Sequence, residues 1–88
     1  MKGTTKSGFE YDVPEDVFDD MELIDALADV TSGRNVLPLS VIVRKVFDEE
    51  QRKRLYDHVR DESGRVPTES IMDVILEIAS ESTDGKNS

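Results

Sequence analysis

The chain has 88 residues, enough for one small domain. It contains no cysteine, which excludes disulfide bonds and thiolate zinc sites, and no apolar run approaches the roughly 20 residues of a membrane-spanning helix. Its net charge of −9 at pH 7 would repel nucleic acids and anionic membranes over most of its surface. We therefore expect a cytoplasmic protein without a nucleic-acid or membrane partner.

The charge is unevenly distributed along the chain. Residues 1–33 carry nine acidic and two basic side chains, residues 34–65 carry six and eight, and residues 66–88 carry five and one. A surface of this kind suits a basic partner, although solubility alone also accounts for it.

The N-terminal residues give two different signals. Residues 1–8 are polar after Met1, lack the apolar segment of a signal peptide and are predicted to be disordered. Residues 9–13 alternate apolar and polar side chains, which is the period of a strand. Because no partner strand is evident, an extended arm laid over the helices is an equally good interpretation.

A first helix is predicted at residues 15–31, after Pro14 and before Gly33. At about 100° per residue, its core-facing side chains would be Val17, Met21, Ile24, Leu27 and Ala28. Leu23 and Val30 would widen this face on one flank. The opposite side would carry an acidic stripe made of Glu22, Asp25 and Asp29.

Residues 36–47 form the most apolar stretch, and their β-branched side chains favour a strand by propensity. Their spacing favours a helix instead, with one apolar face made of Leu39, Ile42, Val43, Val46 and Phe47. Since Pro38 also suits the first turn of a helix, we predict a helix at residues 38–47. Val41 falls outside its apolar face.

The third helix is predicted at residues 49–61. Asp48 is a good N-cap, and Gln51 completes the pattern of a capping box, in which its side chain would reach back to the cap. Two i, i+4 ion pairs would support this helix, Glu49 with Lys53 and Glu50 with Arg54.

The last helix is predicted at residues 67–82, followed by a polar disordered tail at 83–88. The centre of its apolar face is made of Ile71, Val74, Ile75 and Ile78. Met72, Leu76 and Ala79 widen this face to about 200°, more than one neighbouring element covers. The sequence thus predicts an all-α domain at residues 9–82, with four helices, an N-terminal arm and polar ends.

Enzymatic chemistry finds little support in the sequence. His58 is the only histidine, and neither a nucleophile motif nor a glycine-rich phosphate loop accompanies it. We interpret His58 as an exposed helix residue, and we expect a protein that is not an enzyme and needs no cofactor.

The stretch D-E-S-G-R-V at residues 61–66 resembles part of a calcium loop. With Gly64 at position 6 of such a loop, the first and twelfth positions would be Val59 and Ser70, which are not the required ligands. We therefore expect a plain turn and no metal site.

The basic residues of the third helix lie among as many acidic ones, and only Tyr56 offers an aromatic platform nearby. We expect a solvated helix face here rather than a nucleic-acid site.

Binding to another protein is the remaining kind of function, and the over-wide apolar face of the last helix supports it. The candidate contact residues are Val41, Met72, Leu76 and Ala79. Such a face would also allow self-association.

A family resemblance is carried by residues 37–78, L-P-L-S-V-I-V-R-K-V-F-D-E-E-Q-R-K-R-L-Y-D-H-V-R-D-E-S-G-R-V-P-T-E-S-I-M-D-V-I-L-E-I. An acidic opening helix precedes this run, and the whole pattern covers residues 9–80. It resembles the small tail assembly chaperones of long-tailed, siphovirus-like bacteriophages.

The resemblance implies a mostly helical protein without catalytic residues. It implies binding to the aggregation-prone tape measure protein before the tail tube polymerises, with the tail tube protein as a further candidate partner. It also implies location in the cytoplasm of the bacterial host, absence from the mature virion, and a longer form made by ribosomal frameshifting.

Two other interpretations stay open. The chain could be a small acidic regulator that mimics nucleic acid or binds a basic protein through the acidic stripe, or a structural protein of the virion.

Overall fold

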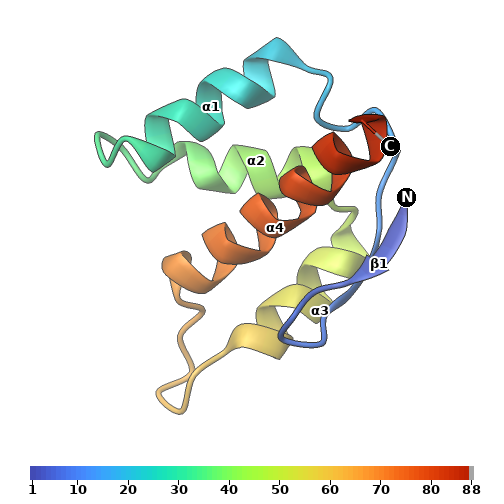
Figure 1. Ribbon diagram of the computed structural model, residues 1–88. Helices are drawn as coiled ribbons and strands as arrows, with labels where there is room; N and C mark the ends of the chain where they lie inside the picture. Colours follow the sequence, from blue (N-terminus) through green and yellow to red (C-terminus); the bar gives the residue numbers. More distant parts are fainter. Residues whose placement is uncertain (88) are drawn as a thin grey trace.

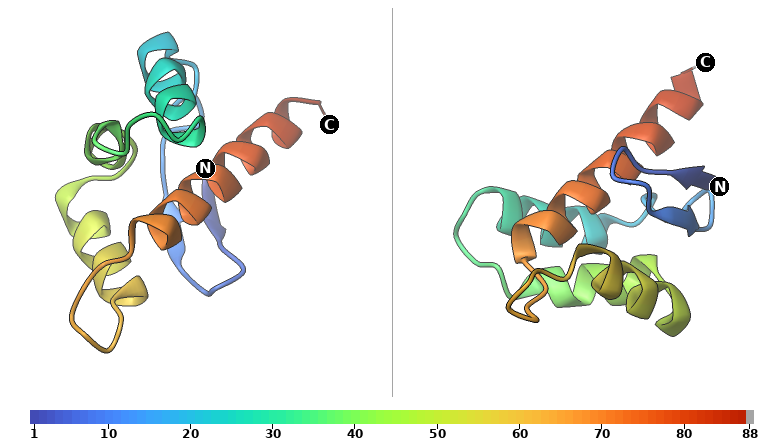
Figure 2. Two further views of the ribbon diagram at one scale, coloured as in Figure 1. Left: turned by 90° about the vertical axis from the view of Figure 1, so that its left-hand side faces the viewer. Right: turned by 90° about the horizontal axis from the view of Figure 1, so that it is seen from below.

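The computed structural model describes the backbone of residues 1–87 and the side chains of residues 1–82. Over this range the elements are β1 (Lys2–Thr4), β2 (Glu10–Asp12), α1 (Met21–Thr31), α2 (Pro38–Val46), α3 (Glu49–Val59) and α4 (Thr68–Asn87). Figure 1 shows α1 and α2 running side by side in opposite directions, with α4 crossing α2. The two strands form a hairpin that lies beside α3 and α4 (Figure 2). The four predicted helices are confirmed, but the predicted all-α class is correct only in part, because a two-stranded sheet is added.

The prediction of disorder at residues 1–8 is wrong, because this segment forms β1 and the turn of the hairpin. Gly3 lies opposite Tyr11, whose ring occupies the space that a side chain at residue 3 would need. Thr5 is buried, and its Oγ1 accepts a hydrogen bond from the N–H of Phe9 at 3.1 Å. Gly3 and Thr5, which belong to the small and polar residues that indicated disorder, thus allow the hairpin to pack closely.

The strand period at residues 9–13 is confirmed by β2, for which β1 is the partner strand. The alternating apolar side chains Phe9, Tyr11 and Val13 are all buried. The ring of Phe9 meets that of Phe47 edge to face, with 5.8 Å between the ring centroids. The hairpin is therefore part of the core and not an arm laid over it.

The first helix begins at Met21 and not at residue 15, because Asp20 provides its N-cap. A carboxylate oxygen of Asp20 accepts hydrogen bonds from the N–H groups of Glu22 and Leu23, at 3.0 and 3.3 Å. Residues 14–19 form two turns instead of the first helical turns.

The buried face of α1 also differs from the prediction. Leu23 and Leu27 are buried, whereas Met21 and Ile24 are 68% and 40% exposed. The predicted face was drawn through Val17, which the structure places before the helix. Without that residue, the side that packs against α2 is the one on which Leu23 and Leu27 lie.

α2 confirms that the 3.6-residue period outweighs strand propensity. Its predicted apolar face, including Phe47 just beyond its last residue, is buried, and Val41 remains 51% exposed. Asp48 caps α3 as predicted, since its side chain accepts a hydrogen bond from the N–H of Gln51 at 2.8 Å. α3 ends at Val59, two residues earlier than predicted.

The side chain of Gln51 does not complete the predicted capping box. Its Oε1 accepts a hydrogen bond from the N–H of Asp12 at 2.8 Å, and its Nε2 donates one to the carbonyl of Asp12 at 2.9 Å. Arg54 also reaches the hairpin, donating to the carbonyl of Glu10 at 3.1 Å. Two side chains of α3 thus occupy the outer edge of β2.

Of the two ion pairs predicted along α3, the structure has that between Glu49 and Lys53, at 3.8 Å. The predicted pair of Glu50 with Arg54 is absent from the described residues. Arg54 turns to the hairpin instead, where its guanidinium lies 5.6 Å from the ring centroid of Phe9.

The predicted centre of α4 is buried as expected, with Ile75 and Ile78 fully enclosed. The helix runs to Asn87 instead of ending near Ser82. No proline interrupts residues 68–87, so nothing in the chain forces the backbone out of the helix there. Of the tail predicted at 83–88, residue 88 lies outside the described part of the chain.

Candidate functional site

An apolar depression lies between the start of α2 and the start of α4. Its first hollow has a volume of about 290 Å³ and is lined by Val36, Leu37, Leu39, Tyr56 and Val66, among others. A second hollow, of about 380 Å³, adjoins it and is lined by Val30 of α1 and by Met72 and Leu76 of α4, among others. Because Val36, Leu39 and Thr68 line both, we treat the two hollows as one surface, the apolar groove.

Exposed apolar side chains stand along this groove. Leu37 is 76% exposed, Val36 is 49% exposed and Leu76 is 43% exposed. Beneath them, Leu39 and Ile71 belong to the buried core. The floor of the groove is therefore made of buried apolar side chains, and the apolar side chains along its edges are exposed to water.

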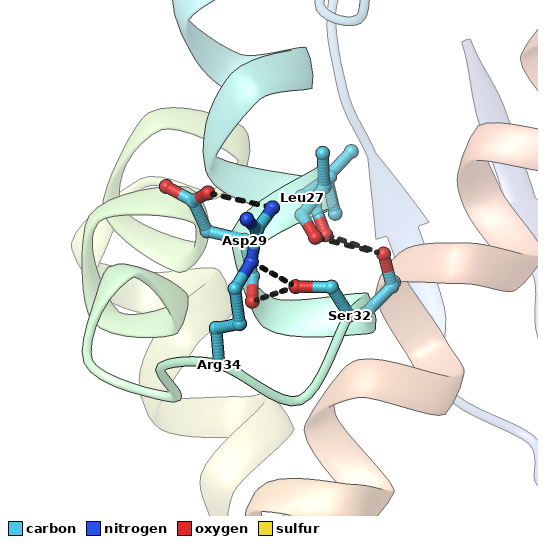
Figure 3. Close-up of polar contacts among 6 residues, drawn as sticks. Leu27, Asp29, Ser32 and Arg34 are labelled. Atoms are coloured by element: carbon cyan, nitrogen blue, oxygen red, sulfur yellow. Dashed lines mark hydrogen bonds and ion pairs between the residues drawn. The ribbon is translucent and has the colours of Figure 1, made fainter.

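The loop that carries Val36 begins with a set of polar contacts at the end of α1 (Figure 3). Ser32 Oγ donates to the carbonyl of Asp29 at 3.0 Å, and Arg34 Nε donates to Ser32 Oγ at 3.1 Å. The guanidinium of Arg34 also points to the carboxylate of Asp29, with 4.0 Å between Nη2 and Oδ1. Gly33 has a φ of +77°, a left-handed conformation that ends the helix at little cost.

The end of the same loop is ordered by Asn35. Its Oδ1 accepts a hydrogen bond from the N–H of Leu37 at 3.0 Å, and Pro38 then starts α2. The loop is thus held at both ends, which fixes the positions from which Val36 and Leu37 project.

The four contact residues predicted from the sequence are not all brought together. Met72 and Leu76 line the groove, as the over-wide face of α4 suggested. Ala79 is half-buried and lines neither hollow, and Val41 lies on another side of α2.

Val36 and Leu37 line the groove but were not among the candidate residues predicted from the sequence. Their signal in the sequence is two consecutive apolar residues between Asn35 and Pro38, in a stretch with loop chemistry. An apolar pair in a loop has no helix face or strand face on which both side chains would be turned toward the core.

A second exposed apolar patch lies along the seam between α1 and α2. Lys45 Nζ is 3.3 Å from Asp20 Oδ2 across this seam. Ile24 follows Asp20 by four residues and Val41 precedes Lys45 by four, so helical periodicity places both on the side marked by the ion pair. Val41 therefore belongs to this seam and not to the apolar groove.

Charged side chains form the rim of the groove at α4. Glu69 and Asp73 line the second hollow, are exposed and are one helical turn apart. Neither forms an ion pair with any other residue whose side chain the structure describes. This rim of the groove is consequently negative.

His58 is exposed, as predicted, and its Nε2 lies 3.1 Å from Ser7 Oγ in the hairpin turn. Both side chains contact solvent, and the described residues provide no carboxylate hydrogen bond to the other ring nitrogen of His58. The pair ties the hairpin turn to α3.

The segment that resembled a calcium loop is a turn in which the Asp61 carboxylate forms hydrogen bonds with other groups of the same turn. Asp61 Oδ1 accepts hydrogen bonds from Ser63 Oγ, Ser63 N–H and Arg65 N–H, at 2.6, 2.9 and 3.1 Å. These hydrogen bonds, that of the Ser63 hydroxyl first, hold the pKa of Asp61 below its ordinary value of 3.8. Among the described residues, no group of three or more His, Cys, Asp or Glu is arranged to hold a metal ion.

The described helices include none that is both long enough and apolar enough to pass through a membrane. No protein-family model, curated protein or solved structure matches the chain.

Proposed function

We propose that this protein is an assembly chaperone that binds apolar segments of another protein through the apolar groove and keeps them soluble. The observation that carries the proposal is the row of exposed Val36, Leu37 and Leu76 above a buried apolar floor. In a chain of 88 residues, such a surface is a candidate for contact with another protein.

The shape of the groove favours a helical segment as the ligand. The groove is lined by residues of α2 and α4, with Val30 of α1 at one end, and is apolar along its floor. An amphipathic helix places apolar side chains at intervals of three and four residues on one face, which suits a groove of this kind.

Because residues 37–78 resemble the tail assembly chaperones, we propose a phage tape measure protein as the partner. Binding would take place in the bacterial cytoplasm before the tail tube polymerises, and the chaperone would be absent from the finished virion. The long apolar helices of an unassembled tape measure protein are the kind of surface that the groove would shield.

The test uses a pair of valines of nearly equal exposure. Val36 in the groove and Val41 on the α1–α2 seam are 49% and 51% exposed. In co-expression with the tape measure protein of the same genome, we expect Val36→Glu to abolish co-purification and Val41→Glu to retain it. Circular dichroism of both variants checks that the helices are intact.

The outcomes separate the possible surfaces. Loss of capture with Val41→Glu alone would place the contact on the seam. Full capture by a double variant, Val36→Glu with Leu76→Glu, would show that the groove is not the site and would overturn the proposal.

A second candidate function rests on the acidic stripe of α1. Glu22 and Asp25 are exposed and form no ion pair with any residue whose side chain is described. An acidic regulator that binds a basic partner through this stripe would lose that partner steeply as salt rises, whereas binding in an apolar groove would persist. Pull-down at low and at high salt distinguishes the two functions.

A further inference from the structure

We propose that the segment bound in the apolar groove is an amphipathic helix with basic side chains along the edge that faces α4. This inference rests on the proposed function, because it specifies the chemistry of the ligand at the same site. It follows from the charges at the two rims of the groove, which differ in sign.

The rim at α4 is negative. Glu69 and Asp73 line the same hollow as Met72 and Leu76, so a helix that covers the apolar pair also approaches the two carboxylates. The next acid in this i, i+4 row, Glu77, is already engaged, since its Oε2 accepts a hydrogen bond from the N–H of Lys6 at 2.9 Å.

The unpaired charges of Glu69 and Asp73 would be partly desolvated by a bound helix. An apolar edge placed against them would remove water without replacing its hydrogen bonds, which is unfavourable. Lysine or arginine side chains on that edge would supply the missing partners and lay their methylene groups over the apolar floor.

The rim at α2 carries the opposite charge. Ser40 lines the first hollow, and Arg44 Nε lies 3.5 Å from Ser40 Oγ, so a guanidinium stands beside this edge. Arg44 is exposed and forms no ion pair with a described side chain. A basic side chain on the α2 edge of the ligand would be repelled there, which sets the rotation of the bound helix.

The test uses two synthetic helical peptides of about 18 residues, or five turns. Both carry leucine at the same i, i+3, i+4 and i+7 positions, and one flank holds lysine in the first peptide and glutamate in the second. Affinities for the full chain are measured by fluorescence anisotropy in about 150 mM salt, where distant charges are screened. Since partly exposed ion pairs contribute modestly, we expect the lysine peptide to bind about tenfold more tightly.

A matched pair of charge variants shows whether the preference arises at the groove. The double variant Glu69→Gln with Asp73→Asn should reduce the preference to about twofold or less. The control, Glu22→Gln with Asp25→Asn, removes the same charge from the exposed stripe of α1 and should retain the preference. Equal losses in both double variants would show a general effect of net charge and would overturn the inference.

The inference and the proposed function can fail separately. Equal binding of the two peptides, both weakened by Val36→Glu, would overturn the charge preference and leave the groove as the binding site. Failure of both peptides to bind would overturn the inference, and the capture experiment with the tape measure protein would then decide the proposed function alone.

Discussion

At the scale of single residues, the side chain of Gln51 links the hairpin to α3 by two hydrogen bonds. Its amide group makes two hydrogen bonds to the backbone of Asp12, as a neighbouring strand would. Gln51 is only 9% exposed, so water cannot readily replace these contacts. With Arg54, which donates to the carbonyl of Glu10, Gln51 occupies the edge of β2 where a third strand could otherwise pair.

Replacing Gln51 with alanine should therefore lower the free energy of unfolding. Two partly buried hydrogen bonds are lost, which corresponds to about 1–3 kcal/mol. Urea denaturation followed by circular dichroism measures the change.

The control for this variant is Lys53→Ala, two residues along α3. Lys53 and its partner Glu49 are 76% and 75% exposed, so that loss should stay within about 0.5 kcal/mol. A Gln51→Ala variant as stable as the Lys53→Ala variant would show that the link to Asp12 does not hold the hairpin.

Asp20 links the stability of α1 to pH. The hydrogen bond from Lys45 is the largest cause, followed by that from the N–H of Leu23, and together they hold the pKa of Asp20 below its ordinary value of 3.8. A carboxyl group with a lowered pKa in the folded state stabilises that state at higher pH. This contribution is complete above the ordinary value and is lost as the pH falls through the lowered pKa.

The variant Asp20→Asn should isolate this effect, because asparagine is also a good N-cap but carries no charge. We expect the variant to be less stable than the wild type at pH 7, and the difference to shrink as the pH falls below 3.8, the ordinary pKa of the carboxyl group. Urea denaturation at a series of pH values measures it, with Asp19→Asn as the exposed control. A difference that is the same at pH 2 as at pH 7 would contradict the assignment.

At the scale of the elements, α1 differs from α4 in the number of its neighbours. It packs chiefly against α2, whereas α4 packs against both α2 and α3. Its outer side, with Met21 and Ile24, is exposed to solvent. Because α1 has one main neighbour, it can open locally while the contacts of α4 with α2 and α3 stay in place.

Amide hydrogen exchange should reveal this difference. We expect the N–H of Leu27, in α1, to exchange through a local opening that depends weakly on urea. The N–H of Ile75, in α4, should exchange through global unfolding with a strong urea dependence. Equal protection and equal urea dependence at the two sites would show that α1 opens only with the whole molecule.

The elements that the sequence located well are those whose signals are local. Pro38 and Asp48 define the starts of α2 and α3 within one turn of chain, and both starts are as predicted. The start of α1 was misplaced because Pro14 and Asp20 are both plausible beginnings. The choice between them depends on Asp20, whose second partner, Lys45, lies in another helix.

At the scale of the whole molecule, the hairpin could not be predicted, because its strands are recognised only through each other. Residues 2–4 are polar and glycine-containing, and nothing in them signals that Gly3 fits beneath the ring of Tyr11. The hydrogen bond from Gln51 to the carbonyl of Asp12 could not be predicted either. The position of Gln51 three residues after Asp48 already fitted a capping box, so no distant partner was expected.

The candidate groove was predictable only on its α4 side. Met72 and Leu76 were found because a helix with too wide an apolar face must expose part of it. The contribution of Val36 and Leu37 depends on where the loop between α1 and α2 comes to lie in space. Periodicity carries no information about such a position.

The loop between α1 and α2 affects how the sequence of this protein can change during evolution. Val36 and Leu37 are outside the buried core, and the polar contacts that hold their loop come from Ser32, Arg34 and Asn35. In this loop, the side chains that would meet a partner are therefore not the ones that hold the loop in place. Substitutions at positions 36 and 37 can alter the preferred ligand at little cost in stability, so recognition can follow a changing partner while the scaffold stays the same.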